Sequence, residues 1–596
     1  MKNRFTALFL IFTILATLLS SCNSTPTPAP DGGCTEHSDS DGDGRCDACK
    51  AEMPGTPDPT PDPDPDEPGG GDQLPSDGWD KTTLLFELSV DVSQGLTSGA
   101  CSYLSGEVDS PADLEAGVKQ RNDDAEAYAG VDVSYVYYPG GAPASHGVWG
   151  ASVNHITELA TSTTDANRPD IFCNYEYDLF AASLRGAFAN LYGDGAGSYG
   201  VDVGERGNYF SFVKDGAYDP EYVDTGSGYM IDYMRSLALS EGRMYIVASD
   251  YFIDTVRAML VIPVNARLFY DVTAQSYGGD AFNRDYDGDG KYELSDFYEL
   301  VERGGWTYSA LRDFAFEIEA GTLAFDTLDG IHGFALGTDG IGAAGFLYTS
   351  TAEVIKREVT DGGSYEYAYA DSGEALSELV SELGSLFSSE GMGITFVEST
   401  NYGTTPELAI RNRFSNNKIL FGGVDYFGSL EDASYQSMYG DDPSFEYSGF
   451  GLAPIPLEDG STGGYSTTLY NAARSGAIAA MSNKFAQCSA FLDYQSTHSG
   501  DVLDAYIRGT VDKKDGNVDM AYRIRAGIGG ALDRVLDNEI IRRVSFTPAN
   551  SDVWRWTYTV TYHGYAITYD QMLQYYSDAI AVKRAFLDEI SADAAD

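Results

Sequence analysis

The sequence predicts an α/β fold divided into two lobes. Beyond about residue 80, roughly 515 residues follow without a strong linker, which is more than one compact core usually holds. Strand-like apolar runs alternate with segments of helical periodicity along this stretch. The predicted strands cover residues 131–138, 170–174, 244–247 and 259–264. Mixed strands and helices in this order favour an α/β architecture.

Two helices are predicted from their first residues. Thr307 is a capping residue, and the apolar side chains after it share one helical face that ends before Gly321: Leu311, Phe314, Ala315 and Ile318. Thr568 and Gln571 form a capping box before a long C-terminal helix with one apolar face: Leu573, Tyr576, Ile580, Leu587 and Ile590. Both apolar faces are predicted to be core.

The first 22 residues are typical of a bacterial lipoprotein export signal. Lys2 and Arg4 form a basic start, residues 5–19 are apolar, and Ser20-Ser21-Cys22 follows as a small-small-cysteine ending. We expect cleavage after residue 21 and lipidation of Cys22, which places the mature chain on the outer face of the cytoplasmic membrane. An ordinary cleaved signal and an uncleaved anchor are the alternatives.

Residues 22–80 are predicted to be the lipid anchor and an extended stalk. Prolines and aspartates alternate over residues 57–66, which favours polyproline II and mutual repulsion of the carboxylates. Gly69, Gly70 and Gly71 add a flexible joint before the folded part, 81–596. A plain disordered tail has the same physical properties.

A small group of metal-binding residue types lies inside the stalk. Three cysteines and one histidine have spacings that suit tetrahedral zinc: Cys34, His37, Cys46 and Cys49. Alternating aspartates before a glycine resemble the first half of a calcium loop: Asp39, Asp41, Asp43 and Gly44. Lys50 stands where that loop needs an acid, and disulfides compete with zinc for the same cysteines. A zinc site, a calcium site and a structureless or disulfide-tied stalk therefore all stay open.

A second calcium-loop pattern lies in the main part of the chain. Its oxygen donors have the spacing of a twelve-residue loop, with Gly290 at the sixth position: Asp285, Asp287, Asp289, Lys291 through its carbonyl, Glu293 and Asp296. This pattern predicts a structural calcium ion, and an acidic surface turn is the alternative. Aspartate at the twelfth position departs from the bidentate glutamate of an EF-hand.

The composition limits the partners. With 37 Lys+Arg against 91 Asp+Glu, the formal net charge is −54, which repels phosphate backbones and excludes nucleic-acid binding. A solvated acidic surface explains this charge without a cationic ligand. Seven cysteines in 596 residues are too few for a disulfide scaffold.

Several segments follow one another in an order known from a single family. Residues 295–307 contain a helix, a glycine stop and Trp306-Thr307; the other segments are 259–269, 451–456, 463–465, Tyr506, 513–515 and Met520. Over roughly residues 150–540 the chain resembles the extracellular solute-binding proteins of carbohydrate-type ABC importers, solute-binding family 1. The resemblance implies a periplasmic-binding-protein-like fold with a hinge and an inter-lobe cleft, and an importer permease as partner. It implies a second lobe at about 255–415, with the first lobe formed by the remainder of 81–596.

Candidate ligand contacts follow from topology, because ligands of open α/β sheets lie outside the carboxyl ends of the strands. Two groups of residues lie at or just after the carboxyl ends of predicted strands, and one tyrosine lies on the loop that resembles the family's cleft loop: Asn174, Tyr175 and Glu176; Ser249, Asp250 and Tyr251; and Tyr465. Tyrosine faces and planar polar groups are suited to sugars. Trp306 is predicted to be core rather than a sugar platform.

These features predict a membrane-anchored binding protein that captures a sugar or oligosaccharide, and no enzyme. A glycoside hydrolase with two working carboxylates is the first alternative, and a cell-surface adhesin with a dockerin-like loop is the second. The sequence has no Ser/His/Asp elbow, no His-Glu-x-x-His and no phosphate-binding glycine loop. Peptide and polyol ligands remain open.

Overall fold

The computed structural model divides the chain into two compact units, Met1–Pro75 and Ser76–Asp596. All residues that the structure describes lie in the second unit: 81–89, 112–138, 151–164, 167–192, 207–213, 228–274, 285, 293–320, 330–337, 345–346, 349, 355–360, 365–369, 378, 382, 394–397, 406–440, 448–470 and 473–529. Among these residues, no helix combines the length and the apolar character that a membrane span requires.

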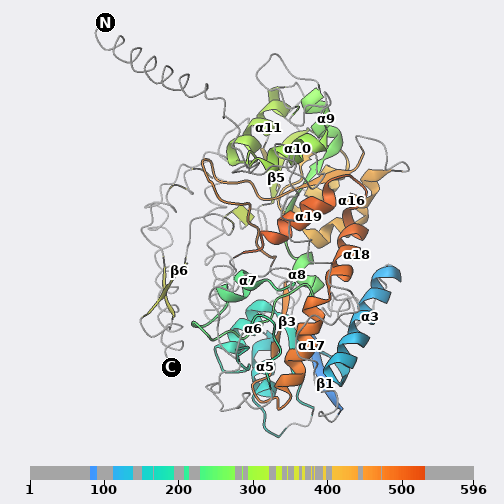
Figure 1. Ribbon diagram of the computed structural model, residues 1–596. Coiled ribbons are helices and arrows are strands. Elements are labelled where there is room, and N and C mark those ends of the chain that lie inside the picture. The colour runs from blue at the N-terminus through green and yellow to red at the C-terminus, as the bar shows by residue number, and fades with distance from the viewer. Residues whose placement is uncertain are drawn as a thin grey trace, which may run out of the picture. The chain divides into compact units, whose positions relative to one another are not determined.

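The first lobe is built on a four-stranded sheet with the order β12-β3-β1-β2, of which β1 and β3 are labelled in the lower part of Figure 1. Its strands are β1 (Thr82–Ser89), β2 (Val131–Tyr138), β3 (Ile171–Tyr175) and β12 (Arg474–Ile478). β1 pairs with β2 and β3 in parallel, whereas β12 pairs antiparallel with β3. The carboxyl ends of the three parallel strands therefore lie at one edge, together with the first residue of β12.

Helices cover both faces of this sheet. Successive side chains of a strand point to opposite faces, so neighbouring residues of β1 identify the two layers. The ring of Phe86 lies 5.5 Å from that of Phe491 on α17, whereas the carboxylate of Glu87 contacts His155 on α5. The helices of this lobe are α3 (Ala112–Ala129), α5 (Ala151–Ala160), α6 (Glu176–Ser183), α7 (Ile231–Ser236) and α17 (Phe485–Thr497).

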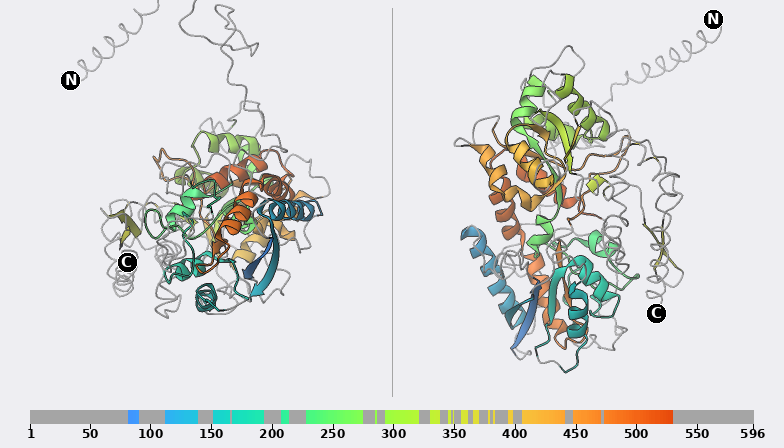
Figure 2. Two further views of the ribbon diagram at one scale, coloured as in Figure 1. Left: turned by 60° about the horizontal axis from the view of Figure 1, so that its bottom comes forward. Right: turned by 180° about the vertical axis from the view of Figure 1, so that it is seen from behind.

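The second lobe is built on a separate six-stranded sheet, in which β5 is parallel to β8 and β9 while β4 is antiparallel to β9, β10 and β11. Its strands are β4 (Leu260–Asn265), β5 (His332–Gly337), β8 (Ile394–Val397), β9 (Ile419–Phe421), β10 (Asp425–Tyr426) and β11 (Phe450–Ala453). β6 (Ile355–Val359) and β7 (Tyr365–Tyr369) form a separate antiparallel pair. The structure thus confirms the predicted α/β class with two lobes, whose sheets lie at opposite ends of the described part in Figure 2.

The second sheet has its own helices and aromatic core. The helices are α9 (Ala266–Ala274), α10 (Leu294–Glu302), α11 (Tyr308–Ala320) and α15 (Pro406–Ser415), followed by the short helices η2 (Phe427–Glu431), α16 (Ala433–Gln436) and η3 (Ser437–Tyr439). Trp306 is fully buried, with its ring 5.0 Å from that of Phe297 and 4.8 Å from that of Phe421. Its indole N–H donates to the carbonyl of Pro454 at 2.9 Å, so the prediction that Trp306 is core is confirmed.

Most of the predicted elements that lie among the described residues are present. The predicted strand 131–138 is β2, and the helix predicted after Thr307 is α11, whose Ala310 N–H donates to the Thr307 hydroxyl at 3.3 Å. The strand predicted at 244–247 was wrong, because only Val247 pairs, as an isolated bridge to Gly476. The helix predicted after Thr568 lies outside the described residues.

The second lobe extends further along the chain than the predicted end at about residue 415. β9, β10 and β11 all belong to its sheet, and β11 pairs with β4 from Phe450 to Ala453. This pairing joins segments about 190 residues apart, and local periodicity carries no signal for such distant pairing.

Within the described residues, the chain crosses between the two lobes three times. The first crossing leads from Val247 through α8 (Ile253–Arg257) to β4, and the second returns from β11 to β12. They run side by side, because Leu260 N–H donates to the Thr468 carbonyl at 2.9 Å and Tyr470 N–H to the Ala258 carbonyl at 2.6 Å. The third passes from α17 into α18 (Gly500–Val511) and α19 (Asn517–Ala526), which packs against β11. We refer to these segments together as the hinge.

His332, at the start of β5, makes the second lobe sensitive to acid. Burial, followed by the charge of Arg413, lowers its pKa from 6.5 to about 4. Because the folded protein resists protonation of this ring, stability is lost as the pH falls from about 6.5 toward 4. We expect the melting temperature of the His332→Gln variant to fall less than that of the wild type over this pH range. An equal loss in both proteins, measured by differential scanning calorimetry, would contradict this prediction.

Candidate functional site

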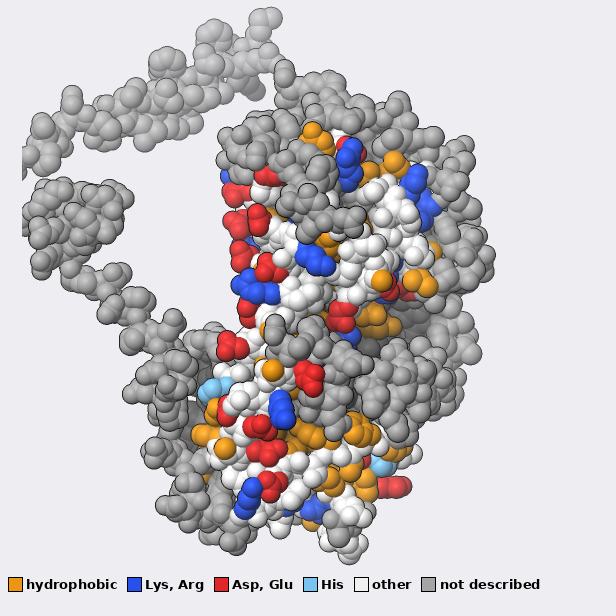
Figure 3. Space-filling model, turned by 90° about the vertical axis from the view of Figure 1, so that its right-hand side faces the viewer, with side chains coloured by type: hydrophobic (Ala, Val, Ile, Leu, Met, Phe, Trp, Pro, Cys, Tyr) orange, Lys and Arg blue, Asp and Glu red, His pale blue; other side chains and the backbone are white. Residues whose placement is uncertain are grey.

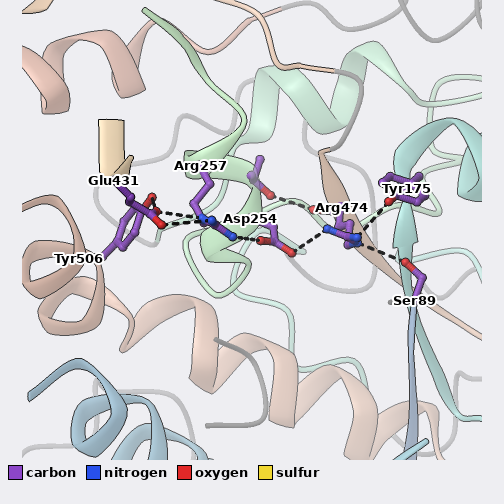
Figure 4. A network of polar contacts seen from close by, with 8 residues as sticks. Ser89, Tyr175, Asp254, Arg257, Glu431, Arg474 and Tyr506 are labelled. Carbon is purple, nitrogen blue, oxygen red and sulfur yellow. Dashed lines mark hydrogen bonds and ion pairs between the residues drawn. The ribbon is translucent and has the colours of Figure 1, made fainter. Parts of the chain in front are cut away.

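The hinge-facing edge of the first sheet is organised by one buried arginine. Arg474 is 4% exposed and begins β12 opposite Tyr175, the last residue of β3. Its guanidinium donates to the Tyr175 hydroxyl at 3.0 Å and to the Ser89 hydroxyl at 3.2 Å, and it lies 4.5 Å from the centre of the Tyr175 ring (Figure 4). Arg474 thus ties the ends of β1, β3 and β12 together.

A buried carboxylate faces this arginine from the hinge. Asp254, on α8, is 5% exposed and has an oxygen 3.4 Å from the Arg474 guanidinium. Burial raises the pKa of Asp254, while the nearby charges of Arg474 and Arg257 oppose that rise. The pair links the first sheet to the first crossing.

The three residues predicted at the carboxyl end of the β3 strand lie at this edge but inside the protein. Asn174, Tyr175 and Glu176 are 1%, 2% and 0% exposed. The Asn174 side-chain oxygen accepts from Tyr175 N–H at 2.7 Å, and Glu176 N–H donates to the Ala473 carbonyl at 3.2 Å. The structure therefore brings them to the predicted edge, and contact with a ligand stays a prediction.

The residues predicted at the first crossing are also buried. Ser249 accepts from the Ser496 hydroxyl at 2.8 Å, and the guanidinium of Arg121 lies 4.9 Å from the centre of the Tyr251 ring. Asp250 accepts two hydrogen bonds from Arg525 on α19, one of them at 2.7 Å. These three side chains hold α3, α17 and α19 against the hinge, and their predicted role in ligand binding is untested.

Tyr465 lies on the second crossing and is half-buried. Its hydroxyl accepts from the backbone N–H of Trp306 at 3.0 Å. Burial raises the pKa of Tyr465 to about 12, although the hydrogen bond from Trp306 opposes the rise. The side chain therefore bridges the second crossing and the start of α11, with part of the ring accessible.

A half-exposed pair of tyrosines marks the hinge-facing edge of the second lobe. The rings of Tyr426, on β10, and Tyr470, on the second crossing, are stacked with centres 5.2 Å apart and planes at 8°. The Arg411 guanidinium lies 5.3 Å from the Tyr426 ring centre and makes two 2.8 Å hydrogen bonds to Asp425. Burial raises the pKa of Tyr470 to about 12, so its neutral phenol is available as a hydrogen-bond donor.

The first lobe has a matching half-exposed aromatic pair. Tyr138, the last residue of β2, stacks on His155 with ring centres 3.6 Å apart and planes at 7°. The His155 Nε2 lies 2.9 Å from a carboxylate oxygen of the buried Glu87. Burial, with the charges of Glu87 and Asp178, raises the pKa of Tyr138. Each lobe thus presents a stacked aromatic pair with a charged residue beside it, near a strand end that faces the hinge.

Sequence reasoning missed most of this arrangement. The predicted ligand contacts included Tyr175 but not Arg474, which binds it. They also lacked the half-exposed pairs and the arginine beside one of them: Tyr138, His155, Tyr426, Tyr470 and Arg411. Tyr138 ends a correctly predicted strand, so the strand-end rule could have identified it. Tyr426 and Tyr470 are 44 residues apart in sequence. They meet because β10 pairs with the start of β4 and Tyr470 N–H donates to the Ala258 carbonyl just before that strand, an arrangement that leaves no local signal.

The predicted calcium loop is only partly described. Asp287, Asp289 and Lys291 lie outside the described residues, whereas Asp285, Glu293 and Asp296 lie within them. Asp296 accepts from Glu293 N–H at 3.0 Å and, with Glu293, forms the capping box of α10. The described residues contain no group of three or more His, Cys, Asp or Glu arranged to hold a metal.

Calcium binding by this loop stays a prediction with a direct test. If the loop binds calcium, adding about 1 mM calcium chloride raises the melting temperature, because a ligand that binds only the folded state stabilises it. The Asp287→Ala variant should lose that rise, and a chelator should reverse it in the wild type. Equal melting temperatures with and without calcium in both proteins would reject the site.

Two other predicted sites lie outside the described residues: the lipidation site Cys22, and the zinc or calcium group at Cys34, His37, Cys46 and Cys49. Zinc binding and lipidation therefore stay predictions. The two described cysteines, Cys173 and Cys488, are both buried.

Comparisons with known proteins give structural similarity at low sequence identity. No protein-family model matches the sequence, and no curated protein matches it. The maltose-binding periplasmic protein MalE from Listeria monocytogenes, in complex with maltose, is 12% identical, with a TM-score of 0.46 over 86% of this chain and 99% of that chain. The chain is similar to this binding protein.

Two further solved structures show the same degree of similarity. A family 1 extracellular solute-binding protein from Bifidobacterium longum subsp. infantis is 13% identical, with a TM-score of 0.45 over 85% of this chain and 99% of that chain. The galacto-N-biose-/lacto-N-biose I-binding protein of the ABC transporter from Bifidobacterium longum is 12% identical, with a TM-score of 0.45 over 86% and 98% of the two chains.

Proposed function

We propose that the chain is a membrane-anchored extracytoplasmic solute-binding protein that captures a sugar or oligosaccharide for an ABC importer by closure of its two lobes. The observation that carries the proposal is a pair of separate α/β lobes, which three crossings join among the described residues. Each lobe has a half-exposed aromatic pair at its hinge side. Lobes that are joined by a hinge can close around a ligand.

The chemistry of the two aromatic pairs suits a carbohydrate. The faces of Tyr426, Tyr470 and Tyr138 can pack against the C–H surface of a sugar ring. Their hydroxyl groups and the partly exposed ring of His155 offer donors and acceptors for the hydroxyl groups of the sugar. Together they provide flat apolar surface beside fixed polar groups, as a small-molecule site requires.

The N-terminal sequence supports the proposed location and partner. The export signal ending at Cys22 fits a lipid anchor, and the proline- and aspartate-rich segment fits a stalk that holds the receptor near a permease. The surface is compatible with an aqueous exterior, since acidic and basic side chains are interspersed on the face that carries α3, α16 and α18 (Figure 3).

The proposal is tested by thermal-shift measurements of the full-length protein with a panel of mono- and oligosaccharides, polyols and peptides. A sugar at about 100 times its Kd should stabilise the protein by roughly 2.7 kcal/mol, without release of reducing ends. Release of new reducing ends would favour the glycoside hydrolase. Stabilisation by peptides alone would identify the solute as a peptide and not a sugar. If no compound of the panel stabilised the protein, that result would count against a receptor for these solutes.

Removing the Tyr470 ring should weaken sugar binding while leaving the fold intact. The ring is half-exposed and stacks on Tyr426, so the Tyr470→Ala variant loses part of the proposed sugar platform. We expect the Kd for the most stabilising sugar to rise roughly tenfold or more, which corresponds to about 1.4 kcal/mol.

A matched control for Tyr470→Ala is available on the outer surface of the first lobe. Tyr128, on α3, is also half-buried and has its ring centre 4.9 Å from that of Tyr494 on α17. Tyr128→Ala should leave the Kd within twofold in the same calorimetric titration, a difference of about 0.4 kcal/mol. Equal losses of affinity in the two variants would place the binding site elsewhere.

A further inference from the structure

The short helix α8 is bound to both lobes by two charged side chains that are three residues apart. Asp254 and Arg257 are three residues apart on α8, with a carboxylate oxygen and a guanidinium nitrogen 3.5 Å apart. Figure 4 shows Asp254 directed toward Arg474 of the first lobe and Arg257 directed toward Glu431 of the second. α8 therefore stands between two ion pairs.

The link to the first lobe is buried. The side chains of Arg474 and Asp254 are 5% and 4% exposed, and the Thr255 hydroxyl donates to the Arg474 carbonyl at 3.0 Å. Breaking a buried pair leaves two charges without water, which is strongly unfavourable. α8 should consequently move together with the first lobe.

The link to the second lobe is accessible to water. Arg257 makes hydrogen bonds of 3.1 and 3.2 Å to the two oxygens of Glu431, and these side chains are 25% and 32% exposed. The Tyr506 hydroxyl on α18 donates to the same carboxylate at 2.6 Å. Water can hydrate both charges when this pair separates, so its rupture costs far less than rupture of the buried link.

A rotation of one lobe against the other has to strain either the Arg474–Asp254 pair or the Arg257–Glu431 pair. The Arg257–Glu431 pair is half-exposed and therefore the weaker of the two. We propose that Arg257, Glu431 and Tyr506 form an electrostatic latch that holds the second lobe against α8 and thereby sets the resting arrangement of the lobes. Releasing the latch frees η2, at whose end Glu431 lies, from the first crossing. The proposal concerns the free protein and does not depend on which solute is bound.

The latch makes hinge motion sensitive to salt. The Debye length shrinks from about 10 Å at 0.1 M ionic strength to about 3 Å at 1 M, so salt weakens a half-exposed ion pair more than a buried one. High salt should therefore act as a partial substitute for removing Glu431.

Amide hydrogen exchange of the full chain, read by mass spectrometry without any ligand, tests the latch. The informative amide is Phe427 N–H, at the start of η2, which donates to the Met259 carbonyl at 2.8 Å and so joins η2 to the first crossing, one residue beyond the β10–β4 pairing. In the Glu431→Gln variant we expect exchange there to accelerate at least about threefold, equivalent to about 0.65 kcal/mol, while amides inside the two sheets are unchanged. Tyr506→Phe should give a smaller change in the same direction.

The control removes an ion pair that lies within one lobe. Arg267 and Asp271 are paired on α9 at 3.1 Å, and Arg267→Gln should leave exchange at the hinge unchanged. Raising the salt to about 1 M should accelerate hinge exchange in the wild type more than in Glu431→Gln. Unchanged hinge exchange in Glu431→Gln, or an equal acceleration throughout both sheets, would overturn the latch. Neither result would bear on whether the protein binds sugars.

Discussion

Replacing Arg474 with methionine is expected to lower the free energy of unfolding by about 3–5 kcal/mol, the range for breaking a buried ion pair by removing one partner. The substitution leaves the carboxylate of Asp254 buried and removes the donors to Tyr175 and Ser89. Methionine is long enough to fill most of the space, so the loss reports the missing charge and hydrogen bonds rather than a large cavity. Urea unfolding of both proteins at pH 7 measures this difference in the free energy of unfolding.

An exposed pair is the control for the Arg474 prediction. Arg303 and Glu299 are paired at 2.6 Å on the surface of α10, and their side chains are 57% and 31% exposed. Arg303→Met should change the free energy of unfolding by no more than about 0.5 kcal/mol. A loss under about 1 kcal/mol for Arg474→Met would mean that this edge of the first sheet does not depend on the buried pair.

Replacing Trp306 with alanine is expected to cost about 3–5 kcal/mol, because it deletes the largest fully buried side chain of the second lobe. The cavity would lie between Phe297, Phe314 and Phe421, whose rings all contact the indole. These rings come from α10, α11 and β9, so the loss of packing around the indole should destabilise the second lobe as a whole.

Trp306→Phe separates packing from the hydrogen bond. This variant keeps most of the apolar volume but removes the donor to the Pro454 carbonyl, so it should cost about 1–3 kcal/mol. Both variants are measured by urea unfolding, and the sugar affinity of Trp306→Phe should equal that of the wild type. A weaker affinity at unchanged stability would instead identify Trp306 as a sugar platform.

Local patterns predicted those elements that are defined by their own residues. The β2 strand was predicted at its observed bounds, because alternating side chains from Val131 to Tyr138 indicate a strand with one face more buried than the other. The start of α11 was predicted because Thr307 and the apolar face after it form a complete local signal. Such signals need no information about distant parts of the chain.

Features assembled from distant segments could not be predicted in the same way. The end of the second lobe was placed too early because β11 joins β4 across the sequence. Arg474 looks like an ordinary charged residue until antiparallel pairing brings it opposite Tyr175 and α8 supplies Asp254. The strand-end rule led to Tyr175, but the half-exposed tyrosine pair at Tyr426 and Tyr470 needed the second sheet and the crossing together.

The two lobes are also joined by contacts that limit how they can move. Arg525 on α19 binds Asp250 at the first crossing, and Arg257 binds Glu431 in the second lobe. The first pair is largely buried, with side chains 18% and 9% exposed, whereas the second is half-exposed. Bending should therefore be centred on the side of the hinge where water can replace the ion pair.

The central claim is that the two lobes close on a bound sugar, and small-angle X-ray scattering of the full-length protein tests it most directly. The measurement compares the free protein with the protein saturated by the sugar that stabilises it most. We predict that the radius of gyration falls on saturation, because closure brings the two sheets together. A radius of gyration that stays the same or rises while the sugar is bound would contradict the claim.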